Sequence, residues 1–109
     1  MPKPLIIAHR GASAYAPENT RAAFLLARDM GAGRVIAIDS IPERLDLARQ
    51  FGADEVIDLR ELPTKEQRVA RVKELTAGVG ADVCVEVVGI AGVVQEGLEM
   101  TRVGGRYLW

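Results

Sequence analysis

The segment Gly31-Ala-Gly-Arg-Val-Ile-Ala-Ile-Asp39 indicates the fold class. Its residues Val35 to Ile38 are all apolar and rich in branched side chains, which is typical of a strand buried on both faces. Similar apolar runs lie on either side of it along the chain: Leu5–Ala8, Val56–Ile57, Val83–Val88 and Tyr107–Trp109. Longer segments of helical period separate these runs, so strands and helices alternate. This alternation predicts parallel strands joined by right-handed crossovers.

The expected fold class is α/β, a three-layer open parallel sheet of about five strands in the order 3-2-1-4-5, with helices on both faces. Leu5–Ala8 is expected at the centre of the sheet, between the strands that contain Ile36 and Val85, because its unbroken apolar run suits burial on both faces. The chain has 109 residues, and we expect a single domain over residues 1–109.

Capping signals locate two of the helices. Ser40 and Glu43 have the spacing of a capping box, and Thr64 and Gln67 repeat it. The first helix is expected to end at Gly31 in a left-handed conformation. The first and fourth helices are expected over residues 20–31 and 92–101.

Apolar spacing indicates which helix faces are buried. In the third helix, Val69, Val72 and Leu75 lie three residues apart and are expected to face the protein core. In the fourth helix, Val94 and Leu98 lie four residues apart and mark its apolar stripe.

Composition restricts the function classes. The net charge of -1 argues against a general nucleic-acid binder, and no apolar run approaches the roughly 20 residues that span a membrane. The start Met-Pro-Lys-Pro lacks the apolar stretch of a signal peptide, so a cytoplasmic protein is expected. One histidine, His9, and one cysteine, Cys84, cannot form a structural zinc site, and Cys84 is expected to be a buried small apolar residue.

One segment, residues 5–32, resembles the first βα unit of glycerophosphodiester phosphodiesterases, which are (β/α)8 barrels. The resemblance rests on His-Arg-Gly directly after a strand, followed by Pro-Glu-Asn-Thr at the start of a helix. It implies that His9 and Arg10 would act on a phosphodiester, with Glu18 as a third position of the same site. Imidazole can transfer a proton and guanidinium can bind phosphate oxygens, which suits this chemistry.

Residues 31–108 instead resemble the Rossmann-like (or flavodoxin-like) nucleotide-binding domain of zinc-type, medium-chain alcohol dehydrogenases. The matching segments are residues 31–39, 44–45, 52–57, 80–83, 86–89 and 104–107. The resemblance implies that Asp39 accepts hydrogen bonds from the adenosine ribose, that Arg44 lies beside the adenosine end, and that Gly89 belongs to the same site. From the residues alone, Asp39 could equally cap a turn and Arg44 could be a solvated helix residue.

Both resemblances lack parts of a working site. The Gly-x-Gly-x-x-Gly turn of dinucleotide-binding domains is replaced by residues 9–20, and Glu18 would compete with an anionic ligand for the helix N-terminus. No cofactor is therefore expected, and NAD would bind weakly at most. On the phosphodiesterase side, Ala37 stands where that family has a metal-binding glutamate, and no second histidine exists, so no metal is expected.

These gaps lead to the hypothesis of an artificial or recombined chimera without catalytic activity, joined near residues 31–33. Residues 1–32 would be the grafted phosphodiesterase-like unit and residues 33–109 the dehydrogenase-like part. Two alternatives stay open: a residual NAD-binding module that uses Asp39, Arg44 and Gly89, and a weak metal-dependent phosphodiesterase that uses His9, Arg10, Glu18 and Asp39. Incompletely covered edges or helix faces would favour a homodimer.

Overall fold

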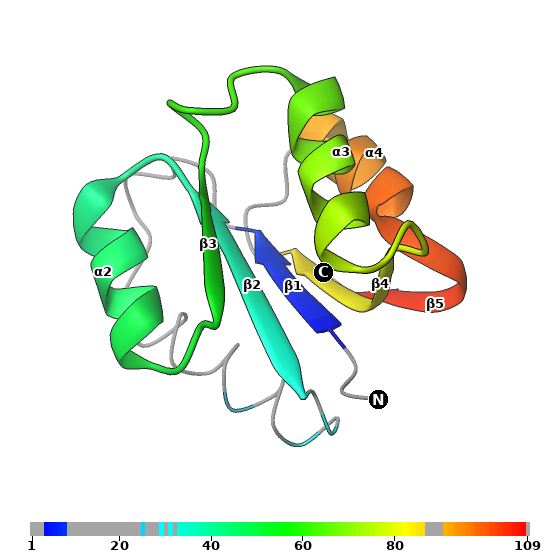
Figure 1. The fold of residues 1–109 in the computed structure, drawn as a ribbon, viewed down its shortest axis with the longest axis horizontal. Coiled ribbons are helices and arrows are strands. Elements are labelled where there is room, and N and C mark those ends of the chain that lie inside the picture. The colour runs from blue at the N-terminus through cyan, green and yellow to red at the C-terminus, as the bar shows by residue number, and fades with distance from the viewer. Residues whose placement is uncertain are drawn as a thin grey trace.

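The computed structural model describes residues 4–8, 25, 29, 31, 33–86 and 91–108, with the backbone alone at residues 4–8, 86 and 91. Strands and helices alternate along most of this range (Figure 1). In chain order the elements are β1 (Pro4–Ala8), β2 (Arg34–Asp39), α2 (Pro42–Gln50), β3 (Glu55–Asp58), α3 (Lys65–Leu75), β4 (Ala81–Glu86), α4 (Ala91–Met100) and β5 (Thr101–Leu108).

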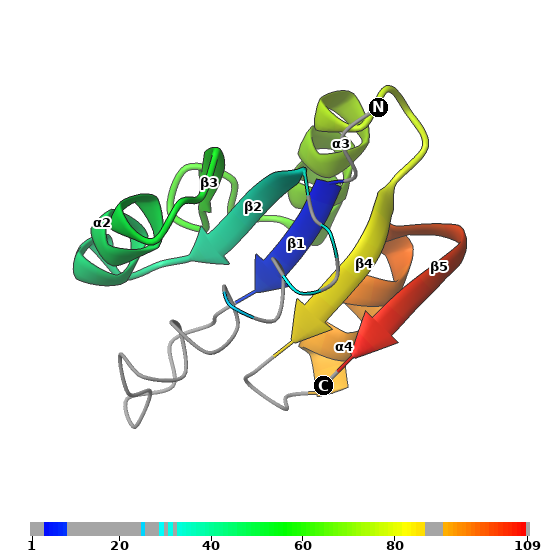
Figure 2. The ribbon, with the colours of Figure 1, turned by 90° about the horizontal axis from the view of Figure 1, so that it is seen from below.

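The strands form one parallel sheet in the order β3-β2-β1-β4-β5, which confirms the predicted fold class and strand order. Strand β1 is central, with Ile6 opposite Ile36 of β2 and opposite Cys84 of β4. Figure 2 shows the arrowheads of β2, β1, β4 and β5 pointing the same way. The carboxyl ends of the strands therefore meet along one edge of the sheet.

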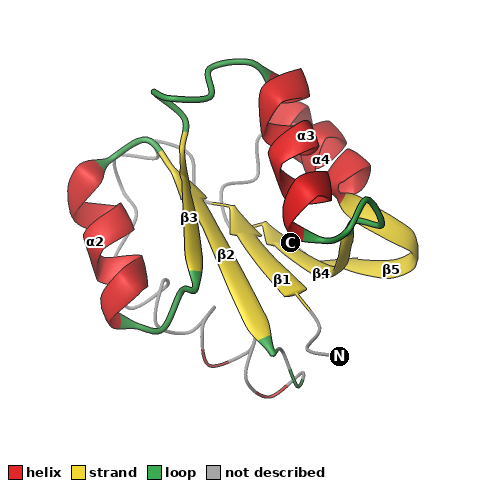
Figure 3. Cartoon of the chain, in the orientation of Figure 1, coloured by secondary structure: helices red, strands yellow, loops and turns green. Residues whose placement is uncertain are grey.

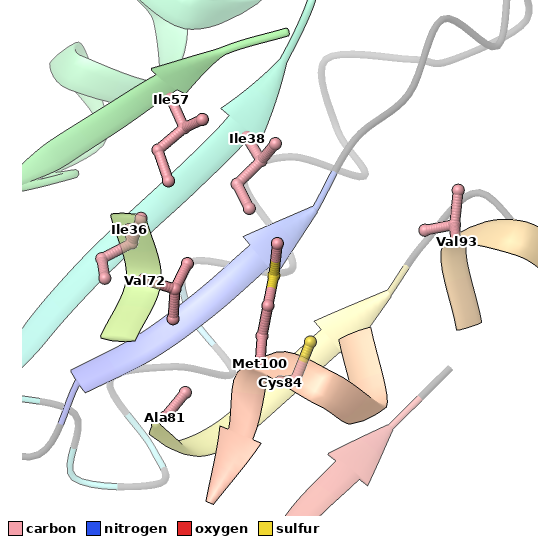
Figure 4. Close-up of a cluster of buried hydrophobic side chains, with 8 residues drawn as sticks. All are labelled: Ile36, Ile38, Ile57, Val72, Ala81, Cys84, Val93 and Met100. Carbon is pink, nitrogen blue, oxygen red and sulfur yellow. The ribbon is translucent and has the colours of Figure 1, made fainter. Parts of the chain in front are cut away.

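Alternate residues of β2 supply the two halves of the core. Val35 and Ala37 lie in a buried cluster with Ala48 of α2. Ile36 and Ile38 lie in a second cluster with Val72 of α3 and with Met100 of α4, part of which Figure 4 draws. Helix α2 thus covers one face of the sheet, and α3 and α4 cover the other.

The two predicted capping boxes differ in outcome. At α3 the Thr64 hydroxyl accepts from the Gln67 amide and the Gln67 side chain accepts from the Thr64 amide, so this prediction is confirmed. At α2 the prediction is wrong: Ile41 occupies the N-cap position and makes no side-chain cap. The carboxylate of Asp39 accepts from the amide of Ser40, so the preceding residue supplies the local acceptor.

The C-terminal segment also departs from expectation. In α4 the buried apolar residues are Val93 and Met100, whereas Leu98 is 50% exposed, so Val94 and Leu98 do not mark the inner face. Strand β5 begins at Thr101 directly after α4 and is longer than the predicted residues 107–109.

The first predicted helix lies mostly outside the described residues. Gly31 has a φ of +77°, the left-handed conformation expected at the end of that helix. No helix in the described part of the chain is long and apolar enough to cross a membrane.

Helix α4 packs closely on β5 at Gly97, where an added Cβ would overlap the Tyr107 ring. We predict that Gly97→Ala lowers the free energy of unfolding by about 1–3 kcal/mol, because the ring must move within a packed core. Gly92→Ala in the same helix is the matched control, since nothing lies within 4 Å of an added Cβ there. Urea unfolding should show the control unchanged or stabilised by up to about 1 kcal/mol. Equal stability of the two variants would contradict the close packing.

Candidate functional site

Two carboxylates mark the carboxyl edge of the sheet. Asp39 ends β2, Asp58 ends β3, and the two residues are register partners in adjacent parallel strands. Ligands of open α/β sheets bind outside this edge, because loops rather than packed helices follow the strand ends there. The edge is therefore the place where the fold would position a ligand.

Asp39 is only 2% exposed. Its Oδ1 accepts from the backbone amide of Ser40 at 2.6 Å and from that of Ile41 at 3.2 Å. Its Oδ2 lies 3.8 Å from Nη1 of Arg44, the first-turn arginine of α2. Backbone amides and a cation together stabilise the ionised carboxylate and fix its orientation.

The carboxylate of Asp58 accepts hydrogen bonds from Arg60, two residues later in the chain. Arg60 donates from Nε to Oδ1 at 3.0 Å, and the Arg60 backbone amide donates to the same oxygen at 2.9 Å. The side-chain hydrogen bond from Arg60 is the main cause that lowers the pKa of Asp58 below its ordinary value. The same contact raises the pKa of Arg60. Asp58 and Arg60 thus form a local charged pair at the end of β3.

The turn after β3 is tied to both strand ends. The Leu59 amide donates to the backbone carbonyl of Asp39 at 3.0 Å, and the Leu62 amide donates to the carbonyl of Asp58 at 3.1 Å. This turn was not predicted, although an aspartate at the end of a strand is a recognised turn signal.

A pocket of about 220 Å³ lies between α2 and the end of β3. Its arginines, Arg49 and Arg60, each face a carboxylate, Asp46 at 3.7 Å and Asp58 at 2.5 Å. The positive charge of the pocket is therefore neutralised locally, which does not favour an anionic ligand there.

Of the predicted cofactor-binding residues, Asp39 and Arg44 are brought together at the carboxyl edge. Gly89 lies outside the described residues, as do His9, Arg10 and Glu18.

Comparison with known proteins places the chain in a family. The sequence profile described as "Zinc-binding dehydrogenase" matches residues 21–109. The 5-exo-hydroxycamphor dehydrogenase of Pseudomonas putida is 42% identical over 87 residues, which are 80% of this chain and 24% of that protein. The L-threonine 3-dehydrogenase of Bacillus licheniformis is 40% identical over 84 residues, 77% of this chain and 23% of the relative.

A solved structure agrees with these relatives. The alcohol dehydrogenase TADH from Thermus sp. ATN1 has a TM-score of 0.76 and 35% identity, and the similarity covers 96% of this chain and 28% of that one. The chain belongs to the zinc-binding dehydrogenase family. It spans about a quarter of the length of the relatives described above.

This membership corrects the hypothesis of an inert, recombined chimera. The family match begins at residue 21, inside the segment assigned to a phosphodiesterase graft, and it gives no support to a chimera. The relatives are named as dehydrogenases, which contradicts the prediction of a domain without catalytic activity.

The comparisons also give no support to the phosphodiesterase alternative. Ala37, at the position proposed for a metal-binding carboxylate, is 1% exposed and packs in the core beneath α2. A side chain at this position faces the core rather than the carboxyl edge, so it could not contribute to a metal site there.

The name of the family implies zinc, and the donor groups of this chain can be tested against it. Among the residues that the structure describes, no group of three or more His, Cys, Asp or Glu side chains could hold a metal ion. Cys84 is a thiol buried in β4, as expected. The described residues do not fit a zinc ion.

The Asp58–Arg60 pair predicts a pH-dependent contribution to stability. Because the pKa of Asp58 is lowered in the folded state, the contribution is present above the ordinary aspartate pKa and is lost as the pH falls through the folded-state pKa. In Arg60→Met, the carboxyl titration of Asp58, followed by carbon NMR, should move upward toward the ordinary aspartate range. Arg49→Met, across the same pocket, should leave it unchanged. An unaltered Asp58 titration in Arg60→Met would contradict this assignment.

Proposed function

We propose that this chain is the nucleotide-binding part of a zinc-type dehydrogenase, an oxidoreductase that uses NAD. Family membership and the relatives' names support the reaction class. The observation that carries the proposal is the buried carboxylate of Asp39, oriented by two backbone amides at the carboxyl end of β2.

Asp39 would accept hydrogen bonds from the hydroxyls of the adenosine ribose. One carboxylate oxygen is held by the Ser40 and Ile41 amides, so the group needs little reorganisation when the ligand arrives. Arg44 lies 3.8 Å from the other oxygen and would border the adenosine end. Gly89, in the segment that follows β4, is the third proposed contact.

The adenosine half of NAD fits the described residues better than the rest of the ligand. In dinucleotide-binding domains a Gly-rich sequence binds the pyrophosphate, whereas the sequence of residues 9–20 contains a single glycine, Gly11. A sequence of this composition offers fewer freely approachable amides than a Gly-rich one. We therefore propose weak binding, about millimolar, which corresponds to roughly 4 kcal/mol.

NAD supplies the hydride acceptor when it is bound, and this chain's own part is to hold and orient it. Hydride transfer and substrate binding are proposed for the whole enzymes of this family, of which this chain spans about a quarter. The homodimer stays a prediction.

We predict that Asp39→Asn weakens NAD binding by about tenfold, because a charge-assisted hydrogen bond contributes roughly 1.5–3 kcal/mol. The asparagine keeps an oxygen for the Ser40 and Ile41 amides, so the fold should be retained. Saturation-transfer NMR titrations with NAD and NADP measure both affinities. The wild-type protein should prefer NAD, because the 2′-phosphate of NADP meets the Asp39 charge, and Asp39→Asn should lose most of this preference.

Asp46→Asn is the matched control, because Asp46 lies exposed on α2 and should not affect either affinity. No saturation by NAD at concentrations well above the millimolar range, or the same NAD preference in Asp39→Asn as in the wild type, would contradict the proposal.

A further inference from the structure

Arg68 and Glu96 form a buried ion pair between α3 and α4. Arg68 is 6% exposed and Glu96 is 4% exposed. Nε of Arg68 donates to Oε2 of Glu96 at 2.9 Å, and Nη2 donates to Oε1 at 2.7 Å, so the contact is bidentate. Figure 1 shows the two helices side by side on one face of the sheet.

The third nitrogen of the Arg68 guanidinium binds a residue outside the two helices. Its Nη1 donates to the backbone carbonyl of Leu62 at 2.9 Å. Leu62 lies in the loop between β3 and α3, which Figure 3 draws in green at the carboxyl side of the sheet. A residue of the helix layer thus contacts the loop next to the candidate site.

Backbone hydrogen bonds continue this connection to Asp39. The amide of Leu62 donates to the carbonyl of Asp58 at 3.1 Å, and the amide of Leu59 donates to the carbonyl of Asp39 at 3.0 Å. An unbroken series of contacts therefore runs from Glu96 through Arg68 and the turn of residues 58–62 to the residue that we propose binds the ribose.

We propose that Arg68 is a positioning residue, which Glu96 orients so that it holds the turn of residues 58–62 at the nucleotide-binding edge. The expected effect on NAD binding rests on the proposed function, whereas the expected effect on the turn does not.

Joining the two helices does not by itself require this pair. Lys65 and Glu99 form a second ion pair between the same helices, at 3.0 Å. The apolar side chains of Val72, Val93 and Met100 are buried in one cluster at this interface. Burying two charges costs several kcal/mol each, and apolar side chains of similar volume are often as stable. The distinctive contribution of Arg68 is its bond to the Leu62 carbonyl.

The test replaces both charges at once, because removing Arg68 alone would take its cation away from the buried carboxylate of Glu96. The double variant Arg68→Met/Glu96→Met keeps side chains of similar length. Thermal unfolding, amide hydrogen exchange at Leu59 and NAD affinity are measured on the 109-residue chain. We expect a melting temperature close to that of the wild type, with exchange at Leu59 and the dissociation constant of NAD each increased about threefold to tenfold, since one hydrogen bond contributes roughly 0.5–1.5 kcal/mol.

The matched control is Lys65→Met/Glu99→Met, which removes the neighbouring pair on the same two helices without touching the loop. It should leave both the exchange at Leu59 and the NAD affinity unchanged. Arg68→Lys is the second test variant: it keeps a cation for Glu96 but cannot reproduce the fork that also reaches Leu62, so it should show the same increases.

Unchanged exchange at Leu59 in either folded test variant would overturn the positioning role. So would failure of both test variants to fold, because the pair would then be needed for the fold as a whole. If the wild type binds no NAD, the proposed function fails, while exchange at Leu59 still decides whether Arg68 holds the turn.

Discussion

Burial of β2 on both faces is the constraint on which the rest of the structure depends. Val35 and Ala37 must be covered by α2, and Ile36 and Ile38 must be covered by α3 and α4, so the helices have to lie on opposite faces of the sheet. Polar groups are excluded along such a strand. The first carboxylate that it can carry, Asp39, therefore comes at its end, where the amides of the following turn can solvate it.

As a consequence of this arrangement, two carboxylates lie at the carboxyl edge of the sheet. Asp39 and Asp58 lie at the same level of neighbouring strands, and each has an arginine from its own following segment, Arg44 or Arg60. Asp39 is the more deeply buried, and its carboxylate is fixed by backbone amides rather than by an exposed side chain. Rigidity of this kind supports the proposed recognition of a ribose.

Local and periodic signals in the sequence predicted the fold well. Strand order and the capping box at Thr64 depend on residues close in the chain or on a general rule of parallel sheets. The inner face of α4 was not predicted because it includes Glu96, which is buried by its ion pair with Arg68, 28 positions earlier. A charged residue at a buried position does not appear in a pattern of apolar residues. Asp39 was found as a candidate through a family resemblance, and its hydrogen bonds from the Ser40 and Ile41 amides also agree with the alternative that it caps a turn. The function was misjudged because the missing Gly-rich turn outweighed the dehydrogenase-like residues, although these extend back to residue 21.

The central claim is that the edge around Asp39 binds the adenosine half of NAD. Amide chemical-shift mapping during titration with NAD tests it most directly, because it locates the contact on the protein. We expect the largest shifts at the amides of Ser40, Ile41 and Leu59, and none at Gly80 or Val103, which lie toward the amino ends of β4 and β5. Shifts centred on Gly80 and Val103, or none at Ser40 and Ile41 when the ligand is saturating, would contradict it.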